Sequence, residues 1–431
     1  MANQEGRRTI RARITNQSAV RADLDSLGFA ASKLWNVARW TAGRIWNGLG
    51  YLPDNLGVSL QSYLKDHERY ADLYSQSSQR VIQELAEAFE SWLEQRANGD
   101  HRANPPGYRK YGDEHPRSTV TFKQKGFKHD DQYDRVRLSK GANLKDGGRY
   151  AHDFVLCEYD VIGPPGTTVE NVQQVRTVYE HGEWRLHFVC RVDVDDEDAP
   201  GDRTAGIDLG ICNFAAVSVG DETLLYPGGA LKEDEYWFHK ERASCDDPTS
   251  RRARRLDQKR TDRRWHFLHA VAKDIVEHCA DRGVGTIAVG DVSGIRDDED
   301  GHARNWGDHG NLDLHSWPFE TVTKLIEYKA QEQGIDVERV DERGTSKTCT
   351  VCGTAADSHR VERGLYVCQE CGLVANADCH GAENIRQKVL PNLAPDGGDR
   401  DTGCLAQPGV RLFDTSTGQV APQEQVADSK P

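Results

Sequence analysis

The stretch TAGIDLGICNFAAVSVG, residues 204–220, places an aspartate inside an apolar segment. Its runs of apolar residues predict the first two strands of a meander, with Asp208 near the end of the first. A carboxylate in an apolar strand costs several kcal/mol unless a partner compensates its charge, and a divalent cation is one such partner. We therefore interpret Asp208 as a candidate metal ligand. The alternative is that Asp-Leu-Gly only forms a turn where the strand ends.

Length and charge limit what this chain can be. It has 431 residues and a formal net charge of −14, from 55 Lys and Arg against 69 Asp and Glu. The length predicts roughly two to four domains. The acidic total argues against a nucleic-acid partner, but a total says little where charges are clustered. Many Arg, abundant Asp and a single Met are typical of proteins from a high-salt cytoplasm, so we interpret the charge as salt adaptation.

Nothing in the sequence predicts a membrane segment or secretion. No run of about 18 uninterrupted apolar residues is present, and the N-terminal segment lacks the apolar region of a signal peptide. We therefore expect a cytoplasmic protein without a membrane partner.

The cysteines carry the strongest motif. Eleven are present, and four of them form two C-x-x-C pairs, each followed by Gly: Cys349, Cys352, Cys368 and Cys371. Two such pairs separated by fifteen residues have the spacing of a zinc ribbon, whose four thiolates surround a structural Zn²⁺. Paired disulfides are the alternative, but an odd total and scattered remaining cysteines favour a reducing compartment.

The N-terminal half alternates between β-type and helical patterns. Residues 7–14 predict a strand, and two helical stretches follow before the pattern breaks at NPPGYRKYG, residues 104–112. Short β-type runs then continue to about residue 200 and favour a small antiparallel barrel or sandwich. We expect this β domain over 1–20 and 104–200, with a helical insertion over 21–103.

The C-terminal half begins after the acidic linker 192–203. After the meander we expect a long polar helix over about 231–282, a strand at 286–290, a helix over about 316–333 and a strand at 335–341. The cysteine-rich segment 345–375 follows, and then a helix in NADCHGAENIRQKVL. The tail, residues 393–431, is rich in Gly, Pro, Asp and Gln, which predicts disorder.

A second candidate carboxylate lies in that last helix. Asp378 occupies its first turn, where a carboxylate is favoured by the helix dipole, so capping alone is one interpretation. The small residues Gly381 and Ala382 allow the helix to pack closely against a sheet. Such packing would bring Asp378 near the ends of the strands.

Together, these motifs resemble those of a known family. Their order is AGIDLGICNFAAVS, IAVGDVSGI, TSKTCTVCG with YVCQECG, and NADCHGAENI. This order resembles that of the TnpB (OrfB) proteins of insertion sequences, which are RNA-guided DNA endonucleases related to type V CRISPR effectors. The resemblance is specific over about 204–390. It implies an α/β multidomain protein: a β-barrel interrupted by a helical recognition lobe, then a RuvC-like nuclease of RNase H fold over 204–344 and 376–392, with the zinc ribbon inserted.

The resemblance also implies catalytic residues. The family's nuclease uses an Asp, a Glu and an Asp, and by motif the two aspartates fall on Asp208 and Asp378. Such carboxylates hold two Mg²⁺ ions. The family's Glu normally ends the fourth strand, but Gly290 stands there in this chain. We expect Asp291 to replace it, although a regular strand would point Asp291 away and a bulge at Gly290 would be needed to turn it inward. Glu299 is another candidate.

Two basic stretches stand out in this acidic chain. Between residues 251 and 264 the cations predict a helix that faces a phosphate backbone, unless they form only a solvated surface: Arg251, Arg252, Arg254, Arg255, Lys259, Arg260, Arg263 and Arg264. Between 108 and 130, cations interleave with aromatic residues, a pattern that favours phosphates and unpaired bases: Arg109, Lys110, Lys123, Lys125 and Lys128. Arg7, Arg8, Arg11 and Arg13 add further candidate contacts.

The sequence therefore predicts a nucleoid-associated, RNA-guided DNA endonuclease of a transposable element. By the family's logic, its partners are a guide RNA, target DNA next to a short adjacent motif and a separate transposase. One alternative keeps the scaffold but not the cutting, because Gly290 replaces the family's Glu, and gives a guided DNA-binding regulator. A second alternative is a zinc-ribbon nucleic-acid-binding protein that uses no guide.

Overall fold

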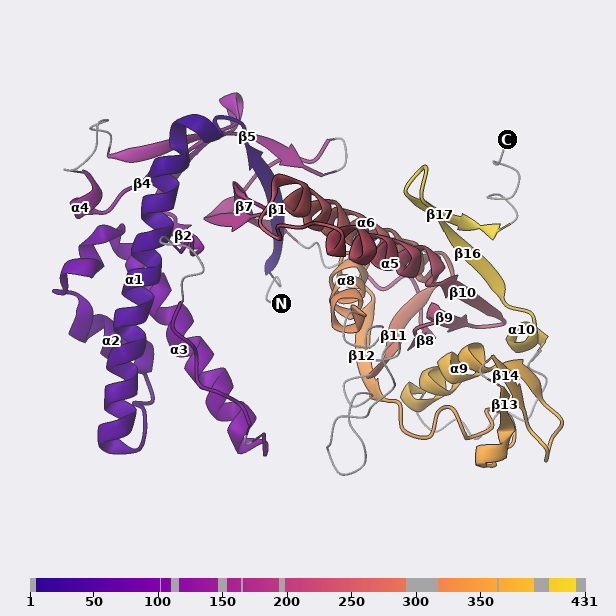
Figure 1. The fold of residues 1–431 in the computed structure, drawn as a ribbon. Helices are drawn as coiled ribbons and strands as arrows, with labels where there is room; N and C mark the ends of the chain where they lie inside the picture. The colour runs from indigo at the N-terminus through magenta and orange to yellow at the C-terminus, as the bar shows by residue number, and fades with distance from the viewer. Residues whose placement is uncertain are drawn as a thin grey trace. The chain divides into compact units, whose positions relative to one another are not determined.

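The computed structural model describes residues 5–100, 102–109, 116–145, 153–163, 166–193, 198–291, 317–362, 364–390 and 403–423. The chain divides into two compact units, Met1–Asp193 and Val194–Pro431. Figure 1 labels the helices and strands of both. Within the described ranges, no helix combines the length and the hydropathy that a membrane span requires.

The first unit is built on one antiparallel sheet. Seven strands in its described residues follow the order β2-β6-β7-β1-β5-β4-β3. They are β1 (Glu5–Ile14), β2 (Val120–Lys123), β3 (Phe127–Asp130), β4 (Arg135–Ser139), β5 (Phe154–Ile162), β6 (Val172–Glu180) and β7 (Glu183–Asp193). The two edge strands, β2 and β3, are joined by a short turn at Gly126, so the sheet curls until it is nearly closed. A small antiparallel barrel or sandwich was expected over these residues.

Helices are inserted between β1 and β2. They are α1 (Gln17–Leu49), α2 (Leu56–Leu64) and α3 (Ser75–Ala97), with the 3-10 turn η1 (Glu68–Asp72). One hydrophobic core joins these helices to the sheet. Trp184 of β7 is fully buried there, and its indole N–H donates to Asp25 Oδ1 of α1 at 2.8 Å. Two short elements, η2 (Asp131–Tyr133) and α4 (Ala142–Lys145), flank β4.

The second unit contains a mixed sheet with the order β12-β11-β8-β9-β10-β16-β17. Its strands are β8 (Arg203–Leu209), β9 (Asn213–Val219), β10 (Glu222–Pro227), β11 (Val284–Asp291), β12 (Asp336–Asp341), β16 (Gly409–Asp414) and β17 (Gln419–Pro422). The first three form the antiparallel meander expected from residues 204–227. On the other side of β8, strands β11 and β12 are parallel to it, so the carboxyl ends of β8, β11 and β12 meet at one edge.

Helices cover both faces of this sheet (Figure 1). They are α5 (Gly229–Ala243), α6 (Arg251–Asp281), α8 (Phe319–Gln331), α9 (Ala377–Val389) and the short α10 (Gly403–Ala406). Side chains of α6 and α8 form one core with Ile207 and Val289. On the other face, Ala382 of α9 packs with Ala216 of β9. Alternation along each strand therefore sends residues 207 and 209 toward α6, and residues 206 and 208 toward α9.

A small sheet of three strands precedes α9. It comprises β13 (Arg360–Glu362), β14 (Leu365–Val367) and β15 (Val374–Asn376), with the 3-10 turn η3 (Asp357–His359) before it. This sheet lies within the cysteine-rich segment that was expected to form a ribbon.

The tail differs from the sequence expectation of disorder over 393–431. Residues 409–414 form β16, which extends the sheet by pairing in parallel with β10. Arg411 forms an ion pair with Asp274 of α6, and the rings of Phe413 and Phe267 lie 5.3 Å apart. The composition of the tail concealed the short segment VRLF, residues 410–413, whose Phe413 side chain packs against α6.

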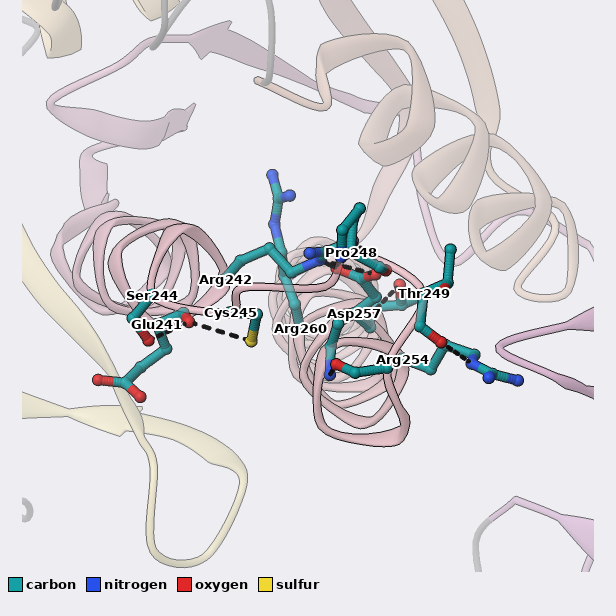
Figure 2. Close-up of polar contacts among 12 residues, drawn as sticks. Glu241, Arg242, Ser244, Cys245, Pro248, Thr249, Arg254, Asp257 and Arg260 are labelled. Carbon is teal, nitrogen blue, oxygen red and sulfur yellow. Dashed lines mark hydrogen bonds and ion pairs between the residues drawn. The ribbon is translucent and has the colours of Figure 1, made fainter. Parts of the chain in front are cut away.

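The long helix expected over 231–282 is instead two helices, α5 and α6. Pro248 ends the helical pattern because proline provides no N–H for the helical hydrogen bond. The side chain of Asp247 accepts from the Thr249 N–H at 2.7 Å, and Ser250 caps α6 by accepting from the Ala253 N–H at 3.1 Å. Arg242 then holds the turn by donating to the Pro248 carbonyl and to Asp257 (Figure 2).

Candidate functional site

Asp208 lies at the carboxyl end of β8, on the face that α9 covers. The register pairs Ile207 with Val289, so Asp208 is the neighbour of Gly290 on the adjacent parallel strand. Asp208 is half-buried, and α9 passes directly over it. A Cβ added to Gly381 would lie only 2.4 Å from Asp208 Oδ2, so only glycine allows the helix to approach this carboxylate so closely.

The backbone packing around this contact is equally tight. A Cβ added to Gly206 would lie 2.1 Å from the Ala382 carbonyl oxygen and 2.6 Å from the Arg386 nitrogen. The glycines of β8 and α9 therefore let helix and strand approach until their backbones are in contact. The sequence predicted that small residues would let this helix pack closely on the sheet, and the structure shows this packing.

Asp378 begins α9 and faces the same end of the sheet. Asn376 caps the helix by accepting from the Asp378 and Cys379 N–H groups at 3.0 and 3.2 Å. The Asp378 side chain is 24% exposed, and its Oδ2 accepts from Asn213 Nδ2 of β9 at 2.8 Å. Arg360 of β13 lies 3.8 Å from its Oδ1. Asp378 is thus oriented by a neighbouring strand as well as by its helix.

Asp291 does not join this group. The ladder between β11 and β12 runs without a shift from Thr286 to Asp291, and it pairs Gly290 with Val340 and Asp291 with Asp341. Because the strand is regular, Asp291 points to the face opposite Gly290, and its side chain is exposed. The predicted bulge at Gly290 is absent from this ladder, which corrects the sequence assignment. Glu299 lies outside the described residues.

A carboxylate that the sequence analysis missed occupies the place beside Gly290. Glu342 follows directly after β12, and a Cβ added to Gly290 would lie 2.2 Å from its Oε1 and 2.8 Å from its Cδ. The position of Glu342 in the sequence could have indicated this carboxylate. A carboxylate directly follows the parallel strand at 335–341, and the carboxyl ends of neighbouring parallel strands meet at one edge.

Burial and neighbouring charges raise the pKa values of two of these carboxylates. Burial raises the pKa of Asp208 well above its ordinary value, and the charges of Glu342 and Asp378 raise it further, whereas Arg360 opposes them. Burial also raises the pKa of Glu342 to about 7, with Asp291 adding to the shift and Lys388 opposing it. Carboxylates that disfavour their own ionisation in this way are stabilised by a bound divalent cation.

The donor set fits Mg²⁺, which prefers carboxylate oxygens. Within the described residues, the four cysteines are the one group of three or more metal-binding side chains whose ligand atoms all lie within 4.8 Å of one another, so the carboxylates are spread more widely. A wider spread suits ligands that serve two ions about 3.5–4 Å apart.

The four cysteines expected to bind zinc do lie together. Cys349 Sγ is 3.6 Å from Cys371 Sγ, and Cys352 Sγ is 3.5 Å from Cys368 Sγ. Four sulfurs about 2.3 Å from one ion are separated by nearly this distance, and all four cysteines are free of disulfides. The cluster is compatible with a structural Zn²⁺ in which every position is taken by a thiolate.

Buried polar contacts attach the cysteine-rich segment, residues 345–375, to α9. His380 stacks on Tyr366 with ring centroids 3.6 Å apart, and its Nε2 accepts from the Thr350 N–H at 3.2 Å. Burial lowers the pKa of His380 to about 4, which keeps the ring neutral and able to accept. Asn384 donates to the carbonyls of Thr345 and Thr348. These contacts join the cysteine-rich segment to the helix that carries Asp378.

The basic stretch 251–264 lies on α6, as expected, but half of its cations are already paired. The acidic side chains of α5 neutralise four of them: Arg252 with Glu241, Arg260 and Arg264 with Glu235, and Arg263 with Asp234. Arg254 donates to the Thr249 carbonyl at 2.9 Å (Figure 2). Within the part of the chain that the structure describes, no acidic partner is found for Arg251, Arg255 and Lys259, which are exposed and lie four residues apart on one helical face.

The second basic stretch divides in the same way. Arg109 is packed over the Trp35 ring, 4.1 Å from its centroid, and burial lowers its pKa. Such a guanidinium is poorly placed to reach a phosphate. Lys123, Lys125 and Lys128 are exposed on and around the β2–β3 hairpin, and Lys110 lies outside the described residues.

Comparisons with known proteins agree with this arrangement. Residues 187–296 match the OrfB_IS605 family, described as "Probable transposase", and residues 319–385 match the "Cas12f1-like, TNB domain" family. "TnpB-like protein ORF457" of Acidianus two-tailed virus is 33% identical over 231 residues, which is 49% of this chain and 48% of that protein. Over these ranges the chain is similar to proteins of the TnpB (OrfB) family. The two matched ranges contain the meander, the candidate carboxylates and the cysteine cluster.

Another relative matches a shorter part of the chain. The "CRISPR-associated endodeoxyribonuclease Cas12f1" of Sulfoacidibacillus thermotolerans is 33% identical over 125 residues, 29% of this chain and 26% of that protein. The chain thus spans about half or less of the length of these curated relatives. A cryo-EM structure of a Cas12f1-sgRNA-target DNA complex covers 89% of this chain and 100% of its own, at 16% identity and a TM-score of 0.37, too low for comparing folds.

Proposed function

We propose that this protein is a TnpB-like, RNA-guided, Mg²⁺-dependent DNA endonuclease of a transposable element. The observation that carries the proposal is that Asp208, at the end of β8, lies against Gly381 of α9, the helix whose first turn carries Asp378. Support also comes from relatives that are named as endodeoxyribonucleases.

The chain's own side chains would hold and orient the metal ions. Asp208 and Asp378 would hold Mg²⁺, and Asn213 orients Asp378 by donating to its Oδ2. When bound, two such ions supply activation of a water and neutralisation of the leaving oxygen in phosphodiester hydrolysis. Arg360, which lies beside Asp378, would meet the phosphate that the metals bind.

Guidance by RNA would rest on surfaces that take phosphates. The exposed lysines of the β2–β3 hairpin and the unpaired face of α6 formed by Arg251, Arg255 and Lys259 are the candidate contacts. Base pairing with a guide RNA would read the target, and the protein would read a short adjacent DNA motif. The zinc ribbon would hold α9 in place, because its buried contacts end on that helix.

A cleavage assay tests this function. The chain is purified with co-expressed RNA, the bound RNA is sequenced, and plasmids carrying the matching sequence beside randomised bases are added with Mg²⁺. The proposal predicts double-strand breaks near the match that require Mg²⁺ and disappear in Asp208→Ala. A regulator that uses the same scaffold would bind the matched plasmid without cutting it. A zinc-ribbon protein that uses no guide would retain no specific RNA.

A further inference from the structure

The neighbourhood of Gly290 suggests how this site is completed. We propose that Glu342 is the third carboxylate ligand of the metal centre and supplies, from the end of β12, the ligand that the family's nuclease carries at the end of the preceding strand. This inference rests on the proposed nuclease function. It identifies a ligand that lies outside the family's motif.

The Glu342 side chain lies where a side chain at residue 290 would be. Its Cγ, Cδ and Oε1 lie 2.7, 2.8 and 2.2 Å from the point where a Cβ at residue 290 would be. The Glu342 side chain therefore fills the space that any side chain at 290 would enter. The position of the Glu342 carboxylate requires glycine at residue 290, because a larger residue there would displace the carboxylate.

The space beside Gly290 lies on the face of the sheet that α9 covers. Gly290 pairs with Val340 of β12. On the β8 side, Val289 pairs with Ile207, so the next residues, Gly290 and Asp208, lie side by side. Gly290 therefore faces α9, as Asp208 does. Glu342 is thus aimed at the face that carries Asp208.

One oxygen of the Glu342 carboxylate is buried without a hydrogen-bond partner in the described residues. This oxygen, Oε1, is inaccessible to solvent. The nearby ammonium group of Lys388 donates instead to the carbonyls of Asp341 and Arg343. Buried carboxylate oxygens are normally paired because an unpaired one costs free energy. A divalent cation shared with Asp208 would satisfy this atom, whereas a purely structural glutamate would leave it unexplained.

Metal binding by the purified chain tests the inference without requiring a guide or a target. Mn²⁺, a spectroscopic substitute for Mg²⁺, is titrated into the full chain, and free Mn²⁺ is measured by electron paramagnetic resonance. The variants are Glu342→Gln, Asp208→Asn and Asp291→Asn. Glu338→Gln is the matched control, since it makes the same change on an exposed residue of β12. Thermal unfolding of each variant checks that it folds.

Glu342→Gln should weaken Mn²⁺ binding by at least about tenfold, because even partners outside the ligand shell contribute about 10–100-fold to metal affinity. Glu338→Gln and Asp291→Asn should leave the affinity unchanged. Gly290→Ala should weaken binding as Glu342→Gln does, because its Cβ displaces the carboxylate. The double variant Gly290→Glu with Glu342→Ala should restore binding by returning a carboxylate to the family's position.

The outcomes separate this inference from the proposed function. If Asp208→Asn abolishes binding and Glu342→Gln has wild-type affinity, the nuclease proposal stands and the role of Glu342 is wrong. The role is also wrong if Asp291→Asn is the variant that weakens binding. If wild-type chain binds no Mn²⁺ above the Asp208→Asn background, the nuclease proposal fails, and the inference about Glu342 fails with it.

Discussion

The contact between β8 and α9 makes a strong prediction about Gly206→Ala. The new Cβ would lie 2.1 Å from the Ala382 carbonyl oxygen, whereas real Cβ atoms essentially never approach other atoms within 3.0 Å. Both obstacles, this oxygen and the Arg386 nitrogen, are backbone atoms, so no side chain can rotate away. The whole of α9 must retreat by about 1 Å, which forfeits its close packing on the sheet. Overpacking of this kind costs roughly 1–3 kcal/mol or more, and we expect the upper end.

Calorimetry of the full chain measures this cost. A loss of about 3 kcal/mol in a unit of this size lowers the melting temperature of the second unit by roughly 6–12 °C. Gly229→Ala in α5 is the matched control, because a Cβ there meets nothing within 4 Å and should be neutral or slightly stabilising. Gly206→Ala should also weaken Mn²⁺ binding, since α9 carries Asp378. A melting temperature indistinguishable from that of the wild type would refute the packing argument.

Three further changes test other parts of the structure. Metal analysis should find about one zinc per chain, and Cys352→Ser should lose it and expose the ribbon to proteolysis, because such sites derive their folding free energy from the metal; full zinc occupancy in the variant would contradict the four-thiolate site. Arg411→Ala should lower the free energy of unfolding by about 1–3 kcal/mol, because it leaves Asp274 partly buried without its cation; a neutral effect in urea unfolding would contradict a structural role for β16. Changing Lys123, Lys125 and Lys128 to Gln should flatten the salt dependence of RNA binding by about 0.7 in slope for each phosphate that the hairpin no longer neutralises; an unchanged slope would remove the hairpin from the interface.

Much of the second unit could be predicted because local patterns and strand geometry agree. The alternation around Asp208 gives β8 and β9, and the apolar run 287–289 gives β11. The small residues after Asp378 indicated close packing of its helix, and Gly381 lies against Asp208. The paired C-x-x-C spacing indicated the cysteine cluster, since four thiolates at this spacing have few other uses in a reducing compartment.

The remainder depended on tertiary contacts that no local pattern contains. Asp291 looked suitable because it ends a strand, but only the regular register with β12 shows that it points away. Glu342 lies next to Gly290 solely because β12 is the parallel neighbour of β11. Likewise, residues 251–264 read as an uncompensated basic helix. Half of these cations are neutralised by acids of α5, which folds back alongside α6 after the turn at Pro248.

The central claim is that Asp208 and Asp378 hold divalent metal together. Crystals of the chain soaked in Mn²⁺, with anomalous scattering measured at the manganese edge, test it most directly. The account predicts a manganese peak with oxygens of both Asp208 and Asp378 within about 2.5 Å, the range of metal–carboxylate bonds. A peak bound elsewhere, or an empty Asp208–Asp378 pair in a structure that holds manganese at other carboxylates, would contradict it.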